Sequence, residues 1–298
     1  SSYSDNYVKS KKQLSYARLL FQKGMITQSE KQLLKAIKLA KHNFDFYSEL
    51  EAWSYLRKIH QFQLDKELVN TAKNEEHKTY MIIQEIQEFE LLHFEISALA
   101  STRENNLSSE TLEKYKKIIS HPKLENIEKC SSIVAVSYFY RIRTMCSEYM
   151  GDMENFHLNA LLRYETLKNT NCFEVDVWEH INTLNNLIES CLFNDKFEDA
   201  VRFNNLLNQI DTNSVYMNSR KQIRYSTLFL QISLASKQLL SINEVEDIIK
   251  KTLLIPAALM RKDERIELIT LMTISCFNQG LYKETTRYIN EFRKLIKS

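Results

Sequence analysis

The chain contains very little glycine and proline. Among its 298 residues there are three glycines and two prolines, well below average usage. Sheet proteins need these residues at their frequent turns, so their scarcity argues against a sheet-rich fold. No two glycines lie close together in the sequence. This spacing excludes a glycine-rich phosphate-binding loop and a serine nucleophile flanked by glycines.

Residue spacing gives no support to a metal site or a catalytic site. No two of the seven histidines lie three or four residues apart, so no helical pair of metal ligands exists. The five cysteines are scattered and form no Cys-x-x-Cys pair. We expect reduced thiols packed in the core rather than disulfides or metal ligands. Glu85 and Glu88 share a helix face, and with Asp65 they are interpreted as solvated positions or ion pairs. We therefore expect no enzyme activity, no cofactor and no metal.

Charge of one sign and long hydrophobic runs are also lacking. The chain has 40 basic and 38 acidic residues, a net charge of +2, so it lacks the basic field typical of nucleic-acid binding. The most apolar run, Leu253 to Met260, is too short to span a membrane and contains Pro256. No signal peptide is visible, and we expect a cytoplasmic location. Because the chain begins with serine rather than methionine, we expect a fragment of a longer protein, and a lost targeting segment remains open.

Apolar residues recur at helical spacing throughout the chain, and the clearest example is the segment 181–207. Its first half carries an apolar stripe of Leu184, Leu187, Ile188 and Cys191. A polar turn at 194–196 follows, and the second half carries a similar stripe of Phe197, Ala200, Val201, Leu206 and Leu207. A helical hairpin this short cannot bury both stripes alone. It therefore predicts neighbouring hairpins on both sides, as in helical repeat proteins.

The positions of the turns predict that this hairpin is repeated. Gly24, Gly151 and Gly280 each fall at a corresponding turn, and Asp195 takes that place in the segment 181–207. Glycine enters the left-handed conformation at a helix end without a steric penalty, and Asp is among the next most tolerant residues. The intervals between these turns are close to multiples of about 42 residues, which predicts further turns at 64–66, 104–106 and 236–238 and about seven hairpins.

Two stretches refine this picture. Residues 66–103 contain neither glycine nor proline, so two helices are expected there without a definable break, and one long helix remains possible. Pro122 ends a helix spanning 112–120, because the residue before proline disfavours the helical conformation. No charge block or low-complexity tract divides the chain. We expect a single continuous domain over residues 1–298.

Three of the turns carry residues that resemble a tetratricopeptide repeat. The sets are Tyr16, Ala17, Leu20, Gly24, Ser29, Leu33 and Ala36; Leu184, Leu187, Ile188, Cys191, Asp195, Ala200, Asn204 and Leu207; and Met272, Thr273, Cys276, Gly280, Thr285 and Ile289. The segments 33–53, 118–143 and 180–200 resemble uncharacterised tetratricopeptide-like proteins of Bacteroidetes-type bacteria. The resemblance implies an all-α fold, an α–α superhelix (solenoid) of about seven TPR-like hairpins. It implies no particular activity.

A superhelix of this kind usually binds partners in its concave groove, which is lined by the first helix of each pair. The positions expected to face this groove are Tyr138, Arg141, Asn182, Asn185, Arg224 and Gln231, together with Arg18, Glu189 and Thr227. Amide and guanidinium groups can pair with the backbone of an extended peptide or with a carboxylate. The alternative is that these are ordinary surface residues.

The functional hypothesis is therefore a non-catalytic protein–protein or peptide-binding scaffold whose partner is a protein or peptide. An alternative is a peptide-sensing module of a larger bacterial signalling or regulatory protein, in which peptide binding shifts the superhelix.

Overall fold

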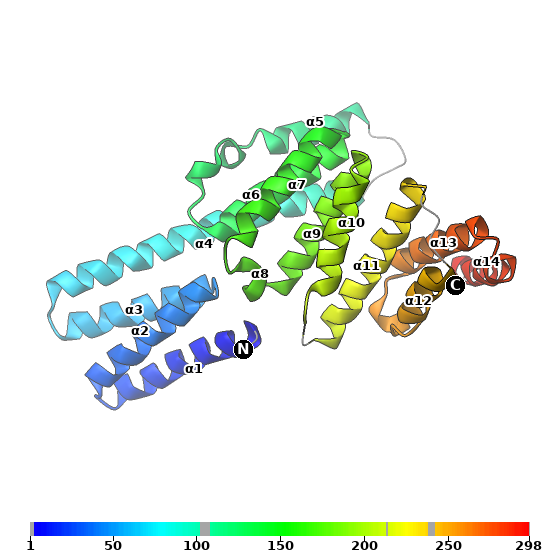
Figure 1. Ribbon diagram of the computed structural model, residues 1–298. Helices are drawn as coiled ribbons and strands as arrows, with labels where there is room; N and C mark the ends of the chain where they lie inside the picture. The colour runs from blue at the N-terminus through cyan, green and yellow to red at the C-terminus, as the bar shows by residue number, and fades with distance from the viewer. Residues whose placement is uncertain (1–2, 102–107, 213, 238–241, 298) are drawn as a thin grey trace. The chain divides into compact units, whose positions relative to one another are not determined.

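The computed structural model describes residues 3–101, 108–212, 214–237 and 242–297 (Figure 1). Every regular element within these ranges is a helix, and they contain no strand. The helices pack in adjacent pairs. The all-helical prediction is thus confirmed for the described part of the chain.

The chain divides into two compact units. The N-terminal unit comprises residues 1–152 and 165–176, and the C-terminal unit comprises residues 153–164 and 177–298. The single continuous domain expected from the sequence stays a prediction.

The described residues of the N-terminal unit form seven complete helices and two short 3₁₀ turns, together with the end of α7. They are α1 (Tyr3–Gln22), α2 (Ile26–His42), α3 (Phe46–Phe62), α4 (Lys66–Ser101), α5 (Ser109–Ile119), η1 (Pro122–Leu124), η2 (Ile127–Lys129), α6 (Ile133–Met150) and the short helix α8 (Cys172–Val175). Helix α7 (Met153–Lys168) contributes residues to both units.

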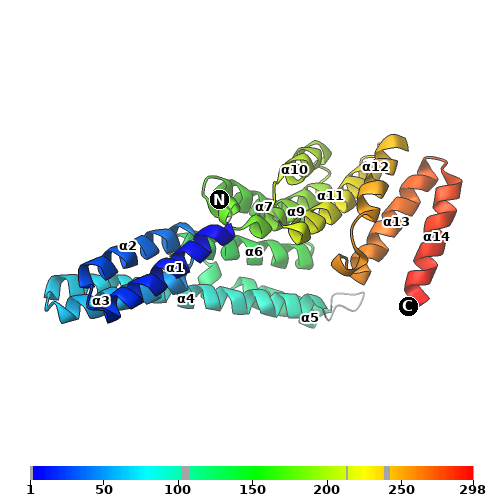
Figure 2. The ribbon, with the colours of Figure 1, turned by 90° about the horizontal axis from the view of Figure 1, so that it is seen from below.

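Helices α1 to α4 lie side by side in the N-terminal unit (Figures 1 and 2). Leu33, Leu56 and Ile59 are fully buried between them. Alanines at positions 17, 36 and 52 are fully buried as well, and their small side chains allow the helix backbones to approach closely. A second core lies between the later part of α4, α5 and α6, and contains Phe89, Ile96, Tyr115, Leu124 and Ile142.

Helix α4 is a single helix of 36 residues, so the alternative of one long helix applies to residues 66–101. Its start is capped by Asp65, whose carboxylate accepts a hydrogen bond from the Leu68 N–H at 3.0 Å. The first part of α4 packs along α3. Arg57 of α3 donates a hydrogen bond from Nε to the Glu76 carboxylate of α4 at 2.6 Å. The later part packs along α6. Two different partners therefore cover the two parts of one continuous helix.

The C-terminal unit is built from further helix pairs. Its elements are the first part of α7, α9 (Val177–Phe193), α10 (Phe197–Gln209), α11 (Val215–Ala235), α12 (Ile242–Leu253), η3 (Ala257–Leu259), α13 (Lys262–Asn278) and α14 (Tyr282–Lys297). One core, centred on Ile181, Leu187 and Leu207, joins α7, α9, α10 and α11. Another, centred on Leu268 and Cys276, joins α11 to α14.

The turns within the helix pairs follow the predicted positions. Left-handed backbone angles occur at Gly24, Gly151 and Gly280, at Asp195 with φ 54°, and at Leu64 and Lys237 with φ 58° and 55°. The N–H that follows the left-handed residue closes several of these turns. Lys196 and Leu281, for example, donate to Cys191 O and Cys276 O, both at 2.9 Å, in the manner of a Schellman cap. The turn predicted at 104–106, and Gln238 of the turn at 236–238, lie outside the described residues.

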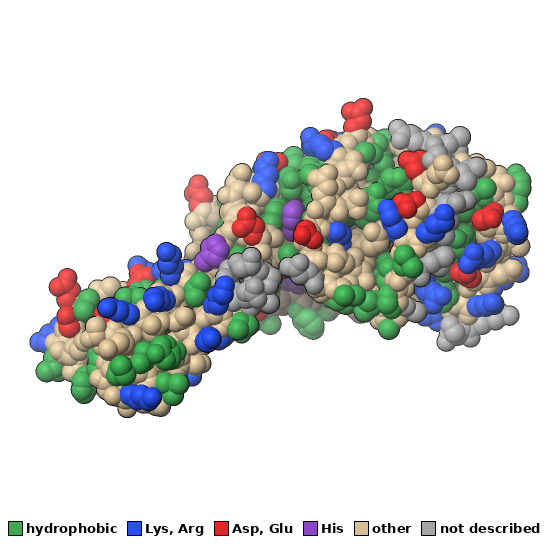
Figure 3. Space-filling view, turned by 60° about the horizontal axis from the view of Figure 1, so that its bottom comes forward, with side chains coloured by type: hydrophobic (Ala, Val, Ile, Leu, Met, Phe, Trp, Pro, Cys, Tyr) green, Lys and Arg blue, Asp and Glu red, His purple; other side chains and the backbone are tan. Residues whose placement is uncertain are grey.

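The surface and the thiols agree with the composition. Among the described residues on the face drawn in Figure 3, basic and acidic side chains are interspersed rather than separated into fields of one sign. All five cysteines are free, and every one except Cys130 is buried, so the prediction of unpaired thiols is confirmed. No described helix is both long enough and apolar enough to cross a membrane.

Candidate functional site

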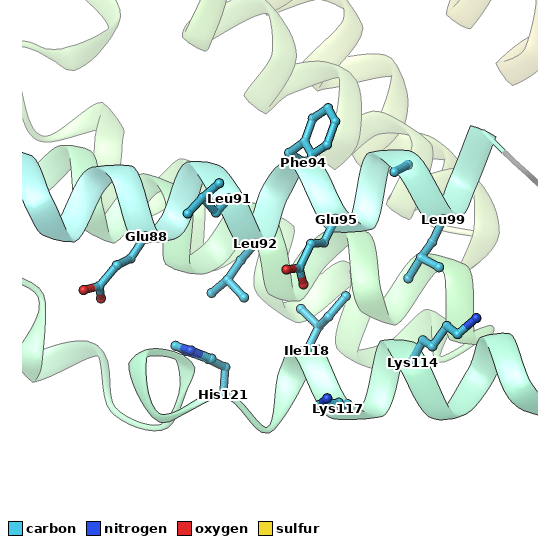
Figure 4. Close-up of a pocket in the computed structure, with 11 residues that line it drawn as sticks. Glu88, Leu91, Leu92, Phe94, Glu95, Leu99, Lys114, Lys117, Ile118 and His121 are labelled. Atoms are coloured by element: carbon cyan, nitrogen blue, oxygen red, sulfur yellow. The ribbon is translucent and has the colours of Figure 1, made fainter.

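A groove of about 990 Å³ lies between α4 and α5 in the N-terminal unit (Figure 4). One wall is the later part of α4, which contributes Glu88, Leu91, Leu92, Phe94, Glu95, Ala98 and Leu99. The other wall is the end of α5 and the residue that follows it, which contribute Lys114, Lys117, Ile118 and His121. We call this feature the α4–α5 groove.

Large apolar side chains of the α4–α5 groove are exposed to solvent. Leu91 is 64% exposed and Phe94 is 69% exposed, whereas Leu92 and Ile118 are buried and belong to the core beneath. Helix α4 thus carries two apolar stripes at three- and four-residue spacing. The stripe of Phe89, Leu92 and Ile96 is covered by α5 and α6, and the stripe of Leu91, Phe94 and Ala98 is left open. An exposed apolar surface next to a groove is typical of an interaction site.

The two walls of the groove carry opposite charge. Glu88 and Glu95 extend from α4, and Lys114 and Lys117 extend from α5 (Figure 4). Glu88 is paired with Lys123 at 3.2 Å, and Lys114 is paired with Glu110 at 2.7 Å. Glu95 and Lys117 have no ion-pair partner among the described residues. The groove therefore offers one unpaired charge of each sign beside an apolar floor.

The wall formed by α5 is held in place by Tyr115 and Ile118, which pack into the core beneath it, and hydrogen bonds stabilise its two ends. Ser108 caps the start of α5 by accepting a hydrogen bond from the Thr111 N–H at 3.1 Å. Beyond its end, Arg143 of α6 donates to Leu124 O at 3.0 Å. Such fixed walls favour a groove that is formed before any partner binds.

Glu85 of α4 ties down the connection between α5 and α6. Its carboxylate accepts hydrogen bonds from the Ser131 N–H at 2.9 Å and from the Ser131 hydroxyl, and it lies 3.9 Å from the Lys123 ammonium. Glu85 is only 6% exposed. Of the two alternatives for Glu85, the solvated position is wrong, because the connection folds back over this face of α4, and the ion pair agrees with the contact to Lys123. Glu88 is solvent-exposed, and it pairs with Lys123 as an ion-pair position would.

Tyr138 and Arg141, predicted to face a concave groove, lie on α6 of the N-terminal unit. The Tyr138 hydroxyl donates to the Glu90 carboxylate at 3.3 Å. The Arg141 guanidinium lies 5.2 Å from the centre of the Tyr138 ring. The centres of the Tyr138 and His93 rings are 6.2 Å apart, in an edge-to-face arrangement. Part of the Tyr138 surface is therefore engaged within the protein.

The other four predicted residues lie in the C-terminal unit, on α9 and α11, which pack against each other. Asn185 of α9 is buried, and its side-chain oxygen has no hydrogen-bond partner among the described residues. Asn182 is half-buried. Gln231 of α11 donates to Glu267 of α13 at 3.0 Å.

The charge of Arg224 also acts on Glu267. Desolvation by surrounding atoms raises the pKa of Glu267, although the residue stays exposed, and the Arg224 charge opposes this rise. The structure thus brings Tyr138 and Arg141 into contact in one unit, and it places the four remaining residues on two packed helices of the other unit. One groove shared by all six stays a prediction.

One cluster of nucleophilic side chains lies in the C-terminal unit. His157 Nδ1 is 3.0 Å from Ser190 Oγ and 4.0 Å from Cys191 Sγ. The Ser190 hydroxyl donates to Leu187 O at 2.7 Å. Burial raises the pKa of the Cys191 thiol to about 11, and burial also lowers the pKa of His157. The thiol therefore stays protonated at neutral pH, and this cluster supplies no activated nucleophile.

The α4–α5 groove was not predicted from the sequence. A signal was present, because residues 88–99 place apolar side chains on two faces of one helix. The sequence could not show that α5 would leave one of those faces open.

Comparison with known proteins adds no further constraint. Among the described residues, no group of three or more His, Cys, Asp or Glu side chains is arranged to hold a metal ion. No model of a known protein family matches the chain, and no curated protein matches it significantly.

Proposed function

We propose that this chain is a non-catalytic protein-binding scaffold, and that the α4–α5 groove binds an apolar segment of a partner protein. The observation that carries the proposal is the exposure of Leu91 and Phe94, at 64% and 69%, beside a groove with fixed walls. Fully burying a side chain of this kind contributes about 1.5–3 kcal/mol. A partner that covers both side chains would gain a useful part of its affinity from them.

The architecture supports a scaffold of this type. Adjacent helix pairs with left-handed turns at matching positions fit a TPR-like superhelix of about seven hairpins. Helices present side chains in a fixed arrangement, so a binding surface built on them loses little freedom when a partner docks.

The predicted concave-face residues of the C-terminal unit are a second proposed surface for a peptide. Asn182 of α9 and Arg224 of α11 are partly exposed, and the two helices pack against each other, which supports this proposal. An amide and a guanidinium can pair with the backbone of an extended peptide. The double variant Asn182→Ala/Arg224→Ala tests this second surface, and unchanged binding would reject it.

The α4–α5 groove is tested with peptides selected against the full chain from a displayed library of random peptides. Their affinities are then measured by fluorescence anisotropy for the wild type, for Phe94→Ser and for Phe62→Ser. The control position Phe62 lies on α3 and is 72% exposed. We expect Phe94→Ser to weaken binding about tenfold or more, and Phe62→Ser to leave it unchanged. Equal affinity for both variants would show that the peptides bind elsewhere.

A further inference from the structure

The floor of the α4–α5 groove, formed by Leu92, Leu99 and Ile118, contains no side chain that could pair with a peptide backbone (Figure 4). The lining groups that can form hydrogen bonds are the charged ends on the two walls and His121, whose Nδ1 already accepts the Lys123 N–H at 3.3 Å. An extended peptide presents a donor and an acceptor at nearly every residue, and these need partners when they are buried. An α-helix satisfies its backbone groups internally. The groove chemistry therefore favours a helical occupant.

The walls of the groove also exclude another common mode of peptide binding. A peptide that binds as an added strand needs the open edge of a sheet. Both walls here are helices, whose ladders occupy their own backbone groups. The apolar side chains of the α4 wall follow helical spacing, so a second helix can pack its ridges between them.

The charges on the two walls define the flanks of this occupant. Along α4, Glu88 and Glu95 are seven residues apart and lie on the same side of the helix. Along α5, Lys114 and Lys117 occupy the opposite wall (Figure 4). An occupant helix would meet acidic groups on one flank and basic groups on the other. Complementary charge at a rim of this kind selects partners and fixes their orientation.

We propose that the α4–α5 groove binds an amphipathic α-helix of a partner protein. Its apolar stripe lies between a flank of Lys or Arg that faces α4 and a flank of Asp or Glu that faces α5. This inference rests on the proposed scaffold function and specifies its partner. The α4 wall from Glu88 to Leu99 is about 16 Å long at a rise of 1.5 Å per residue. The contacting part of the partner helix is therefore about three turns.

Opposed flanks also set the direction of the partner helix. Turning a docked helix end for end, with its apolar stripe still facing the groove, exchanges its left and right flanks. In the reversed direction its basic flank would face Lys114 and Lys117, and its acidic flank would face Glu88 and Glu95. One direction is therefore favoured, because the other places like charges together.

The test uses a library of displayed helical peptides with a fixed leucine stripe and with Lys, Glu or Gln at each flanking position. It is selected against the full chain and against the variant Glu95→Lys/Lys117→Glu. Both residues are exposed and have no ion-pair partner among the described residues. The exchange keeps the net charge and removes no ion pair. The control variant Glu113→Lys/Lys116→Glu exchanges an exposed pair, 2.7 Å apart, that does not line the groove.

We expect the wild type and the control variant to enrich Lys on one flank and Glu on the other. The variant Glu95→Lys/Lys117→Glu is expected to bind these peptides at least about threefold more weakly and to lose the flank preference, because each wall then carries one charge of each sign. A proline placed at a central position outside the apolar stripe should weaken the best peptide at least about tenfold, because it breaks the helix.

Several results would overturn the inference. An identical flank preference in the wild type and the exchanged variant would remove the role of charge. Equal binding of the proline peptide would indicate an extended occupant. Self-association of the full chain that is lost in Phe94→Ser, measured by analytical ultracentrifugation, would identify a second copy as the occupant.

The inference and the proposed function fail in different ways. If random linear peptides bind in a manner that depends on Phe94 while helical peptides do not, only the helical occupant is rejected. If neither library yields binding that depends on Phe94, the proposed function of the groove is rejected as well.

Discussion

A buried ion pair joins α11 to α13 in the C-terminal unit, and the variant Glu264→Leu is expected to destabilise this unit strongly. Arg220 of α11 forms two hydrogen bonds with the Glu264 carboxylate, both at 2.6 Å. The two side chains are only 8% and 4% exposed. The same carboxylate accepts the Arg261 N–H at 3.1 Å at the start of α13.

The size of the effect follows from the charge that the substitution leaves behind. Removing one partner of a buried pair costs about 3–5 kcal/mol, because the remaining charge is buried without compensation. Replacing both partners by apolar residues is often neutral or better. We therefore expect the double variant Arg220→Met/Glu264→Leu to recover most of the stability lost in Glu264→Leu. The control Asp199→Asn breaks an exposed pair with Arg202 at 2.9 Å, and should cost less than about 1 kcal/mol.

The assay is urea unfolding followed by tryptophan fluorescence. The chain has two tryptophans, Trp53 in the N-terminal unit and Trp178 in the C-terminal unit. In a Trp53→Phe background, the signal of Trp178 reports the free energy of unfolding of the C-terminal unit. If Glu264→Leu and the double variant lost the same free energy of unfolding, the buried charge would not be the cause.

The same pair gives a pH dependence of defined sign. Burial alone would raise the pKa of Glu264, but the hydrogen bonds from Arg220 and from the Arg261 N–H hold it below its usual value of 4.5. A depressed pKa in the folded state contributes stability that is present above the pKa of the unfolded state and is lost as pH falls through the folded pKa. The difference in stability between the wild type and Glu264→Gln should therefore shrink as pH falls below about 4.5.

Three further substitutions and one labelling reaction test local features of the structure. Gly280→Ala should lower the free energy of unfolding by about 1–2 kcal/mol. Its φ of +74° strains any residue with a Cβ, although no atom lies within 4 Å of the added Cβ. Asp195→Gly, at φ 54°, should instead be neutral or stabilising, and a loss of stability in both variants would refute the argument from backbone conformation. Glu85→Leu should cost about 1–3 kcal/mol and speed hydrogen exchange of the Ser131 amide, which then loses its acceptor. Cys146 is fully buried, and burial raises the pKa of its thiol to about 12. It should therefore react with iodoacetamide only when its unit unfolds. Labelling in the native state at the rate of an exposed thiol would contradict this.

Much of the fold could be predicted from the sequence because its signals are local. Glycine at 24, 151 and 280 marks the end of a helix through its own backbone freedom. The common interval then located left-handed residues at Leu64 and Lys237, although neither residue type favours that conformation. The left-handed angle of Phe44, 55°, was not predicted. It closes the connection between two helix pairs, where the sequence offers no glycine.

Features that depend on long-range packing could not be predicted. Residues 66–101 contain no helix breaker, so their sequence is compatible with one helix or two, and packing against α3 and then α6 decides for one. Glu85 has the sequence pattern of a surface carboxylate, and it is buried because the connection after α5 returns over it. The α4–α5 groove depends on where α5 lies beside α4. The sequence pattern of α4 does not contain that information.

The most direct test of the binding proposal is methyl NMR of the full chain during titration with a peptide selected from the helical library. The methyl groups of Leu91, Leu99 and Ile118 line the α4–α5 groove. Their resonances should shift and saturate at one peptide per chain. Saturable shifts confined to core methyl groups of the C-terminal unit, such as those of Leu187 and Ile232, would contradict the account.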